Sequence, residues 1–323
     1  MSYQTIDGGI FGDSFRRMNG CGLRMSQKCR RWSFLLSSTV NALTLASLTI
    51  AQLLNSYNSE HVAFKFDVII LFIGVIAGWL AYHGIVYEYQ YEMYLHFLSM
   101  ALAISYCWID YFFNPTPDLT IKLFRNIIPS CLIIPSFLFC LCVTCSEYWS
   151  EFYIVGTSEE FLNMHKKRRF LLCFMKFDFL LVVVVGIFSI NEVYKFSVKS
   201  YVAFVIILSY ALVFWMILSC GITHEKPVLV YIFVYGSMAL PIWITYKFMA
   251  FNCLSKNCTS YEASLNYSEF GSGIISILSR FYVLVKLLDV FRNFGCGLSD
   301  RAFRYLISPE SSSLIRRPRS GSL

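Results

Sequence analysis

Apolar residues dominate eight segments of the chain, each about 20 residues long and bounded by polar stretches. A helix of about 20 apolar residues crosses the hydrocarbon core of a bilayer. The pattern therefore predicts an all-α, polytopic membrane helix bundle with about eight transmembrane helices over residues 33–291. The predicted spans are Ser33–Leu54, Phe66–Tyr87, Tyr91–Phe113, Ile121–Cys145, Phe170–Ile190, Tyr201–Gly221, Val228–Phe251 and Gly271–Phe291.

The eighth segment is the most polar of these, because it carries Arg280, Lys286 and Asp289. We predict that it spans the membrane, and the alternative is a partly buried amphipathic helix. With that segment on the membrane surface, the chain would be a seven-helix protein of the receptor type, with its termini on opposite sides.

The composition agrees with a membrane protein. Hydrophobic residues make up 57% of the chain and charged residues only 15%, against about 25% charged in a typical soluble domain. Residues 1–32 are polar and basic and lack the apolar stretch of a cleavable signal peptide. The first span is therefore expected to direct its own insertion.

The net charge of +7 follows membrane topology rather than a nucleic-acid surface, because the basic residues lie beside helix ends. The lipid bilayer is the expected partner, and nucleic acid is not. With both termini in the cytosol, 17 Lys and Arg residues lie on the cytosolic side. This asymmetry predicts an N-in, C-in topology with cytosolic tails over residues 1–32 and 292–323. The opposite side holds seven, namely Lys65, Lys122, Arg125, Lys195, Lys199, Lys247 and Lys256.

A luminal loop is predicted over Asn252–Phe270, and it contains two N-glycosylation sequences, at Asn257 and Asn266. The same loop holds Cys253 and Cys258. Because a luminal compartment is oxidising, we predict a disulfide between them. The alternative is two free thiols, since the closed ring would be small.

Charged residues at membrane depth are the main candidates for function, because each is costly in hydrocarbon and usually faces the bundle interior. At 1.5 Å per residue, Lys176 and Asp178 lie roughly 10 and 14 Å inside the fifth span. Lys286 and Arg280 lie roughly 9 and 18 Å inside the eighth. We predict that Asp178 pairs with Arg280 or Lys286, and that Lys286 can also pair with Asp289 on its own helix.

Lys176 and Asp178 are about 200° apart around their helix, so they are expected to face different neighbours. The predicted pairing has two interpretations. It is either a structural ion pair that fixes helix register or a site that couples to a proton or ion.

Polar residues on the first span, Ser37, Asn41, Thr44 and Gln52, fall near one helical face. They are predicted to make hydrogen bonds between helices, and the alternative is a polar pathway. Pro129, Pro135 and Pro241 are predicted to kink their helices.

The sequence contains no motif for a catalytic residue, a metal or a cofactor, since HExxH, GxSxG and phosphate-binding patterns are missing. No enzyme activity and no cofactor are therefore predicted. The C-terminal tail contains Glu310, Leu314 and Ile315 in the spacing of an acidic dileucine signal. This pattern predicts sorting by vesicle-coat adaptors.

Two short stretches resemble a family of fungal-type Golgi apparatus multispanning membrane proteins. Lys176-Phe177-Asp178-Phe179 resembles a Lys-aromatic-Asp-aromatic stretch of that family. Arg292-Asn293-Phe294-Gly295-Cys296-Gly297-Leu298 resembles its Asn-Phe-Gly-Lys-Gly-Leu segment, with Cys296 in place of the lysine. The resemblance implies a Golgi or related membrane and supplies no reaction.

These observations together predict a multi-pass endomembrane protein that moves a small solute or ion, or assists such a carrier. The alternative is a scaffold or cargo-sorting protein that transports nothing, and the second alternative is the seven-helix receptor. The expected location is a Golgi or endosomal/lysosomal membrane, with the plasma membrane as an alternative.

Overall fold

The computed structural model describes residues 27–56, 63–87, 89–113, 119–146, 159–188, 198–250 and 260–295, and all the regular elements in these ranges are helices. Seven spans are long and apolar enough to cross a membrane, and they correspond to the first seven predicted segments. They confirm an all-α, multi-pass membrane bundle. The seven are Cys29–Leu54, Phe64–Val86, Gln90–Phe113, Leu119–Thr144, Leu162–Phe188, Val205–Thr223 and Pro227–Tyr246.

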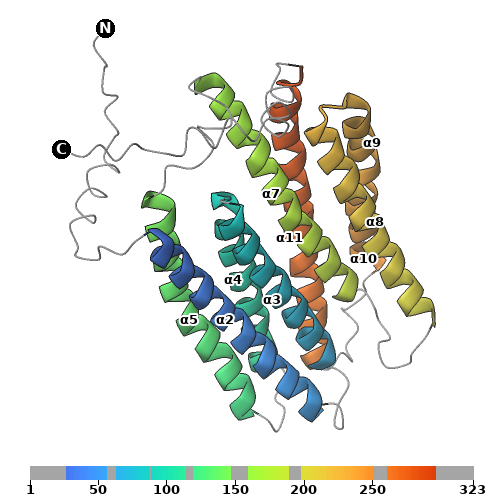
Figure 1. The fold of residues 1–323 in the computed structure, drawn as a ribbon. Coiled ribbons are helices and arrows are strands. Elements are labelled where there is room, and N and C mark those ends of the chain that lie inside the picture. Colours follow the sequence, from blue (N-terminus) through green and yellow to red (C-terminus); the bar gives the residue numbers. More distant parts are fainter. Residues whose placement is uncertain are drawn as a thin grey trace, which may run out of the picture.

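The first four helices form one group (Figure 1). They are α2 (Gln27–Ser56), α3 (Ala63–Val86), α4 (Gln90–Phe113) and α5 (Leu119–Ser146). Because consecutive helices are joined by short connections, each runs antiparallel to the one before it. The non-cytosolic end predicted for this group therefore holds the end of α2, the start of α3, the end of α4 and the start of α5.

The remaining helices form a second group (Figure 1). They are α7 (Glu159–Phe188), α8 (Val198–Thr223), α9 (Pro227–Ser237), α10 (Ala239–Ala250) and α11 (Ser260–Phe291). The helix α7 lies between the two groups, because it packs against α3 and α4 on one side and against α8 and α11 on the other. All its residues from Leu180 to Phe188 are buried. This placement explains why the last part of α7, residues 180–188, is apolar all round rather than on one face.

The seventh predicted span is divided into α9 and α10, which meet at Met238. Proline lacks an amide hydrogen, so Pro241 cannot donate to the carbonyl of Ser237 one turn earlier. A kink at Pro241 was predicted, and the structure has a helix break at Met238, within one turn before this proline. The helix α5 is continuous, although Pro129 and Pro135 lie inside it.

The helix α11 begins at Ser260 rather than at Gly271, so the predicted luminal loop is too long at its C-terminal end. In the added turns Ser268 is buried and Leu265 packs against the core, and the same face continues with the buried Ser272 inside the predicted span. The sequence prediction failed here because this face is built from serine, which does not register as apolar. Small side chains of this kind allow helices to approach closely.

The polarity of α11 keeps it out of the seven apolar spans. Its 32 residues are nevertheless about 48 Å long, enough to cross a bilayer. It runs lengthwise beside α7 in Figure 1, and Val283, Leu287 and Val290 are buried in the core of the second group. This packing shows that α11 belongs to the bundle, and its crossing of the membrane stays a prediction beside the alternative of a partly buried amphipathic helix.

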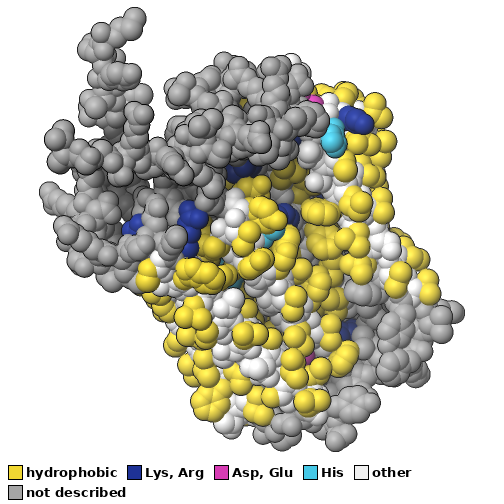
Figure 2. All heavy atoms as spheres, viewed as in Figure 1, with side chains coloured by type: hydrophobic (Ala, Val, Ile, Leu, Met, Phe, Trp, Pro, Cys, Tyr) yellow, Lys and Arg dark blue, Asp and Glu magenta, His cyan; other side chains and the backbone are white. Residues whose placement is uncertain are grey.

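Hydrophobic side chains cover most of the described surface in Figure 2, and most of the visible Lys and Arg side chains lie toward the top of that view. Leu43, Tyr235 and Phe281 are each more than two-thirds exposed. Such side chains on outward helix faces are typical of contact with lipid tails. The described surface therefore supports contact with a bilayer.

The close packing of α8 and α9 gives a test of the fold. A Cβ atom added to Gly236 would lie 2.1 Å from Cε1 of Phe214, whereas a Cβ on Gly271 would meet no atom within 4 Å. We expect Gly236→Ala to lower the free energy of unfolding by about 1–3 kcal/mol, because the helices must separate or Phe214 must move. Thermal unfolding of the detergent-purified protein measures this, with Gly271→Ala as the matched control. Equal melting temperatures for the two variants would contradict the packing.

Candidate functional site

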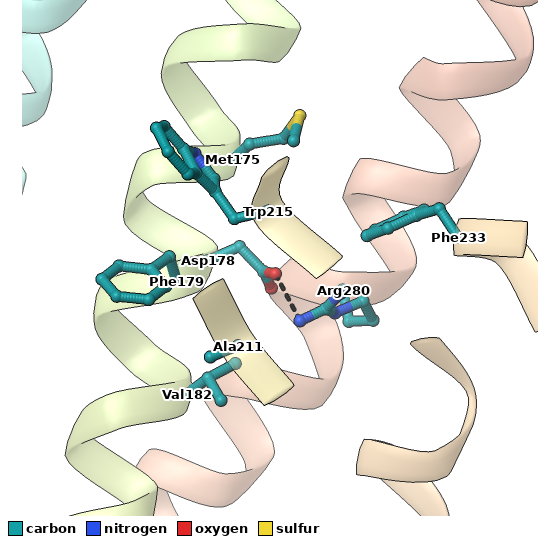
Figure 3. A pocket seen from close by; sticks show the side chains of 8 residues that line it. All are labelled: Met175, Asp178, Phe179, Val182, Ala211, Trp215, Phe233 and Arg280. Atoms are coloured by element: carbon teal, nitrogen blue, oxygen red, sulfur yellow. Dashed lines mark ion pairs between the residues drawn. The ribbon is translucent and has the colours of Figure 1, made fainter. Parts of the chain in front are cut away.

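The first candidate site is an ion pair between α7 and α11 (Figure 3). Nη2 of Arg280 lies 2.7 Å from Oδ2 of Asp178, and the two side chains are 5% and 6% exposed. This is one of the two pairings predicted from their depth. Apolar and aromatic side chains surround the pair, and the guanidinium carbon of Arg280 lies 5.4 Å from the ring centroid of Phe233. The ring face adds a favourable interaction for the cation.

A small cavity adjoins this pair, lined by Asp178, Arg280 and apolar side chains that include Met175 and Trp215 (Figure 3). Its volume is about 10 Å³, enough for about one water molecule. Oδ1 of Asp178 and Nε of Arg280 make no hydrogen bond of normal geometry with the described residues, although the Ser279 hydroxyl lies close enough to interact with the Asp178 carboxylate. The pair therefore keeps unused hydrogen-bonding capacity beside a space for a small species.

Lys176 faces the opposite side of α7, as the 200° separation predicted. Its ammonium group contacts Glu92 of α4 and lies 4.8 Å from the ring centroid of Trp79 on α3. Glu92 is buried and also contacts Nδ1 of His83. We refer to His83, Glu92 and Lys176 as the Glu92 triad, which connects α7 to the first helix group.

Lys286 pairs with Asp289 across one turn of α11, at 3.8 Å, and both side chains are about 40% exposed. The five charged residues that were singled out as candidates therefore do not form one network. The structure divides it into the buried Asp178–Arg280 pair, a contact of Lys176 with Glu92, and this partly exposed pair. Lys286 lies about one and a half turns from Arg280, too far along α11 to replace it beside Asp178.

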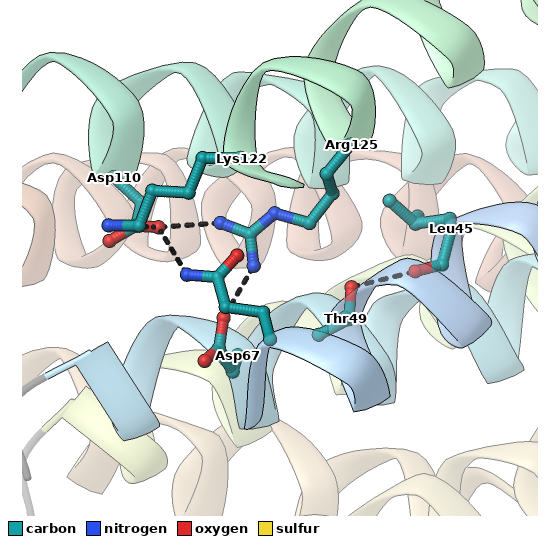
Figure 4. A network of polar contacts seen from close by, with 7 residues as sticks. Leu45, Thr49, Asp67, Asp110, Lys122 and Arg125 are labelled. Carbon is teal, nitrogen blue, oxygen red and sulfur yellow. Dashed lines mark hydrogen bonds and ion pairs between the residues drawn. The ribbon is translucent and has the colours of Figure 1, made fainter. Parts of the chain in front are cut away.

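The second candidate site was missed by the sequence analysis. Arg125 of α5 contacts Asp67 of α3 through Nη1, and its Nη2 lies 2.5 Å from Oδ2 of Asp110 on α4. Lys122 of α5 lies 3.1 Å from the same carboxylate oxygen. All four side chains are fully buried. Figure 4 shows them meeting between α3, α4 and α5, and we call them the four-charge cluster.

The four-charge cluster has two carboxylates and two cations, so its formal charges cancel. Lys122 and Arg125 share a face of α5 because they are three residues apart. Gln52 of α2 donates to Oδ2 of Asp110 at 3.5 Å and brings the fourth helix of the group to the cluster. Buried charges are tolerated when they are paired in this way, and removal of one partner is strongly destabilising.

Lys65, Lys122 and Arg125 were counted as charges beside the luminal membrane surface in the topology prediction, and the structure buries all three side chains between helices. The cluster could have been recognised from the sequence. Asp67, Asp110 and the two cations all lie inside predicted spans, near helix ends on one side of the membrane. The available signal was that successive spans carry equal numbers of acidic and basic residues at one depth, which predicts that these residues pair.

The polar residues of α2 are only partly used as predicted. The hydroxyl of Ser37 is 2.7 Å from that of Ser136 on α5, which gives one contact between helices, and Gln52 gives another. The hydroxyl of Thr44 instead donates to Val40 of its own helix. Asn41 is fully buried, and both of its side-chain polar atoms lack a partner among the described residues.

Of the residues predicted to be glycosylated, to form a disulfide or to act in sorting, the structure describes Asn266. Asn266 lies in the second turn of α11 and is partly buried. Among the described residues, no group of three or more His, Cys, Asp or Glu side chains is arranged to hold a metal ion. The predicted disulfide, the other glycosylation site and the sorting signal lie outside the described residues, namely Cys253, Cys258, Asn257, Glu310, Leu314 and Ile315.

No family model matches this chain, and no curated protein or solved structure matches it either. The fold and the buried ion pairs define it as a multi-pass helical membrane protein with charge-balanced groups inside its bundle.

Proposed function

We propose that this protein is an endomembrane carrier for a proton or a small cation, or a subunit that assists one. The Asp178–Arg280 pair is the proposed coupling site. The observation that carries the proposal is a buried ion pair near the middle of α7, with an unused carboxylate oxygen beside a cavity of about 10 Å³. Ionisable residues at this depth are typical of proton and ion pathways.

The chemistry follows from the pair itself. A proton or cation that binds Asp178 competes with Arg280 for the same carboxylate. Once the carboxylate is neutralised, the attraction between α7 and α11 weakens, and the guanidinium group can move away. Release of the bound species restores the ion pair. Such a cycle links occupation of the site to the relative position of two helices.

The proposed topology keeps both termini in the cytosol. Removing the buried Lys65, Lys122 and Arg125 from the charge count leaves only Lys195, Lys199, Lys247 and Lys256 on the luminal side. The cytosolic excess is then larger, which supports the proposal. The weak resemblance to Golgi multispanning proteins and the Asn257 and Asn266 sequences support an endomembrane location.

Purified protein in liposomes tests the carrier function. We expect proton or cation flux from the wild-type protein and at least a tenfold loss from Asp178→Asn, because the neutral amide cannot exchange a proton or alternate its charge. The matched control is Glu269→Gln, which removes a partly exposed carboxylate of α11 that lines neither this cavity nor the one at Lys286. Its flux is expected to equal that of the wild type.

A second variant separates misfolding from loss of coupling. Asp178→Glu keeps the charge and lengthens the side chain, so it is expected to fold and to alter the flux rate. Wild-type flux from a correctly folded Asp178→Asn would remove this pair as the coupling site. An absence of flux from the wild type under proton, Na⁺ and K⁺ gradients would favour the scaffold.

The alternative function is a scaffold or cargo-sorting protein that engages vesicle-coat adaptors. A specific observation favours it, since the four-charge cluster is fully buried and charge-balanced, as a structural ion network is. In this case all the buried pairs would be structural. The test is relocation of the protein on replacement of Leu314 and Ile315 by alanine. The seven-helix receptor is less favoured, because α11 packs inside the bundle.

A further inference from the structure

A second cavity, much larger than that at Asp178, lies between the ends of α4, α7 and α11. Its volume is about 350 Å³. We call it the basic cavity, and its lining consists of three lysines, one carboxylate, one amide and three aromatic residues. These are Lys166, Lys167, Lys286, Asp289, Asn163, Tyr91, Phe170 and Tyr282.

The charge of the basic cavity favours an anion. Lys166 and Lys167 come from α7, and Lys286 comes from α11, so two helices supply cations to one space. Asp289 supplies the one carboxylate of the lining. It lies 3.8 Å from Lys286, a long separation for an ion pair, and both side chains are about 40% exposed. A net excess of cations therefore faces the cavity.

Aromatic side chains form the apolar part of the lining. The ring of Phe170 contacts that of Tyr91 at a centroid distance of 5.5 Å and that of Tyr282 at 6.3 Å. The ammonium nitrogen of Lys286 lies 5.7 Å from the centroid of Tyr282. One cavity thus combines cations with amphipathic rings, and tyrosine is enriched where membrane meets water.

The position of the basic cavity matches the headgroup layer. Lys166 and Lys167 lie in the second and third turns of α7, just before its apolar stretch, and Lys286 lies between one and two turns before the end of α11. The connection from α3 to α4 lies at the same end of the bundle as Tyr91. In the predicted topology this is the cytosolic side, where anionic lipids concentrate.

We propose that the basic cavity binds the phosphate-bearing headgroup of an anionic membrane lipid. The lysines contact the phosphate and the acidic headgroup, and the aromatic rings lie against the glycerol region. This inference does not rest on the proposed carrier function, because it concerns a different cavity and different residues.

The test uses the full-length protein in a non-ionic detergent with short-chain lipids. Dioctanoyl phosphatidylserine is titrated, and native mass spectrometry counts the bound molecules. Dioctanoyl phosphatidylcholine, which has no net charge, and inorganic phosphate are the comparison ligands. We expect saturable binding of one phosphatidylserine, at least tenfold tighter than that of phosphatidylcholine. Inorganic phosphate that binds as tightly as the lipid would overturn the lipid as the ligand.

Variants locate the site. Lys286→Gln and the double variant Lys166→Gln/Lys167→Gln are expected to weaken phosphatidylserine binding by about fivefold per lysine. Asp289→Asn is expected to strengthen it, because the carboxylate of the lining is neutralised. The matched control is Lys226→Gln, which removes an exposed lysine at the start of α9, outside this cavity. Equal affinity across the four variants and the wild type would overturn the proposal.

Discussion

Replacement of Arg125 by methionine is expected to lower the free energy of unfolding by about 3–5 kcal/mol. The substitution leaves Asp67 without the cation that it contacts, and it removes one of the two cations beside Asp110, which keeps Lys122. Both carboxylates are fully buried. An unpaired buried charge loses its hydration with no compensating partner, so the assembled α2–α5 group becomes unstable.

Thermal unfolding of the protein in detergent measures this effect. Arg292→Met is the matched control, because Arg292 is exposed at the end of α11, and its change is expected to stay within about 0.5 kcal/mol. A rescue variant tests the cause. Asp67→Asn combined with Arg125→Gln leaves Asp110 paired with Lys122 and restores charge balance. It should recover a large part of the stability. A double variant as unstable as Arg125→Met would show that the shape of Arg125, rather than its charge, matters.

Replacement of Arg280 by methionine is expected to have an effect of the same size, about 3–5 kcal/mol, because Asp178 would be left buried and unpaired. The double variant Asp178→Arg/Arg280→Asp places the opposite charges on the opposite helices. We expect it to recover stability, since the attraction between α7 and α11 is restored.

The charge-swap variant also separates the two interpretations of this pair. Recovery of the melting temperature without recovery of flux in liposomes would support a coupling role, because the carboxylate then lies on the wrong helix. Recovery of both would leave only a structural role. If neither Asp178→Arg nor Arg280→Asp alone lowers the melting temperature, the pair does not contribute to the assembly of α7 and α11.

The spans and the Asp178–Arg280 ion pair could be predicted from the sequence, because both follow from counting residues along a helix. A run of about 20 apolar residues identifies a spanning helix whatever it packs against. The rise of 1.5 Å per residue was sufficient to place Asp178 at a depth between those of Arg280 and Lys286. The choice between these two cations depends on how far α11 is shifted along α7 and on its rotation, and only packing determines both.

The four-charge cluster was missed because depth was judged one helix at a time. Asp67, Lys122 and Arg125 each lie within two turns of a helix end, where a charge normally reaches water. They are buried because three helices bring their ends together, so partners replace the solvent. The same limitation hid the serine face of α11, whose burial depends on a neighbour rather than on its own hydrophobicity.

The position of α7 has a mechanical consequence. Lys176 connects it to Glu92 in one helix group, and Asp178, two residues later, connects it to Arg280 in the other. A rigid helix cannot turn about its axis or slide without disturbing both attachments together. A displacement of α7 would therefore change the contacts on both sides of the molecule at once.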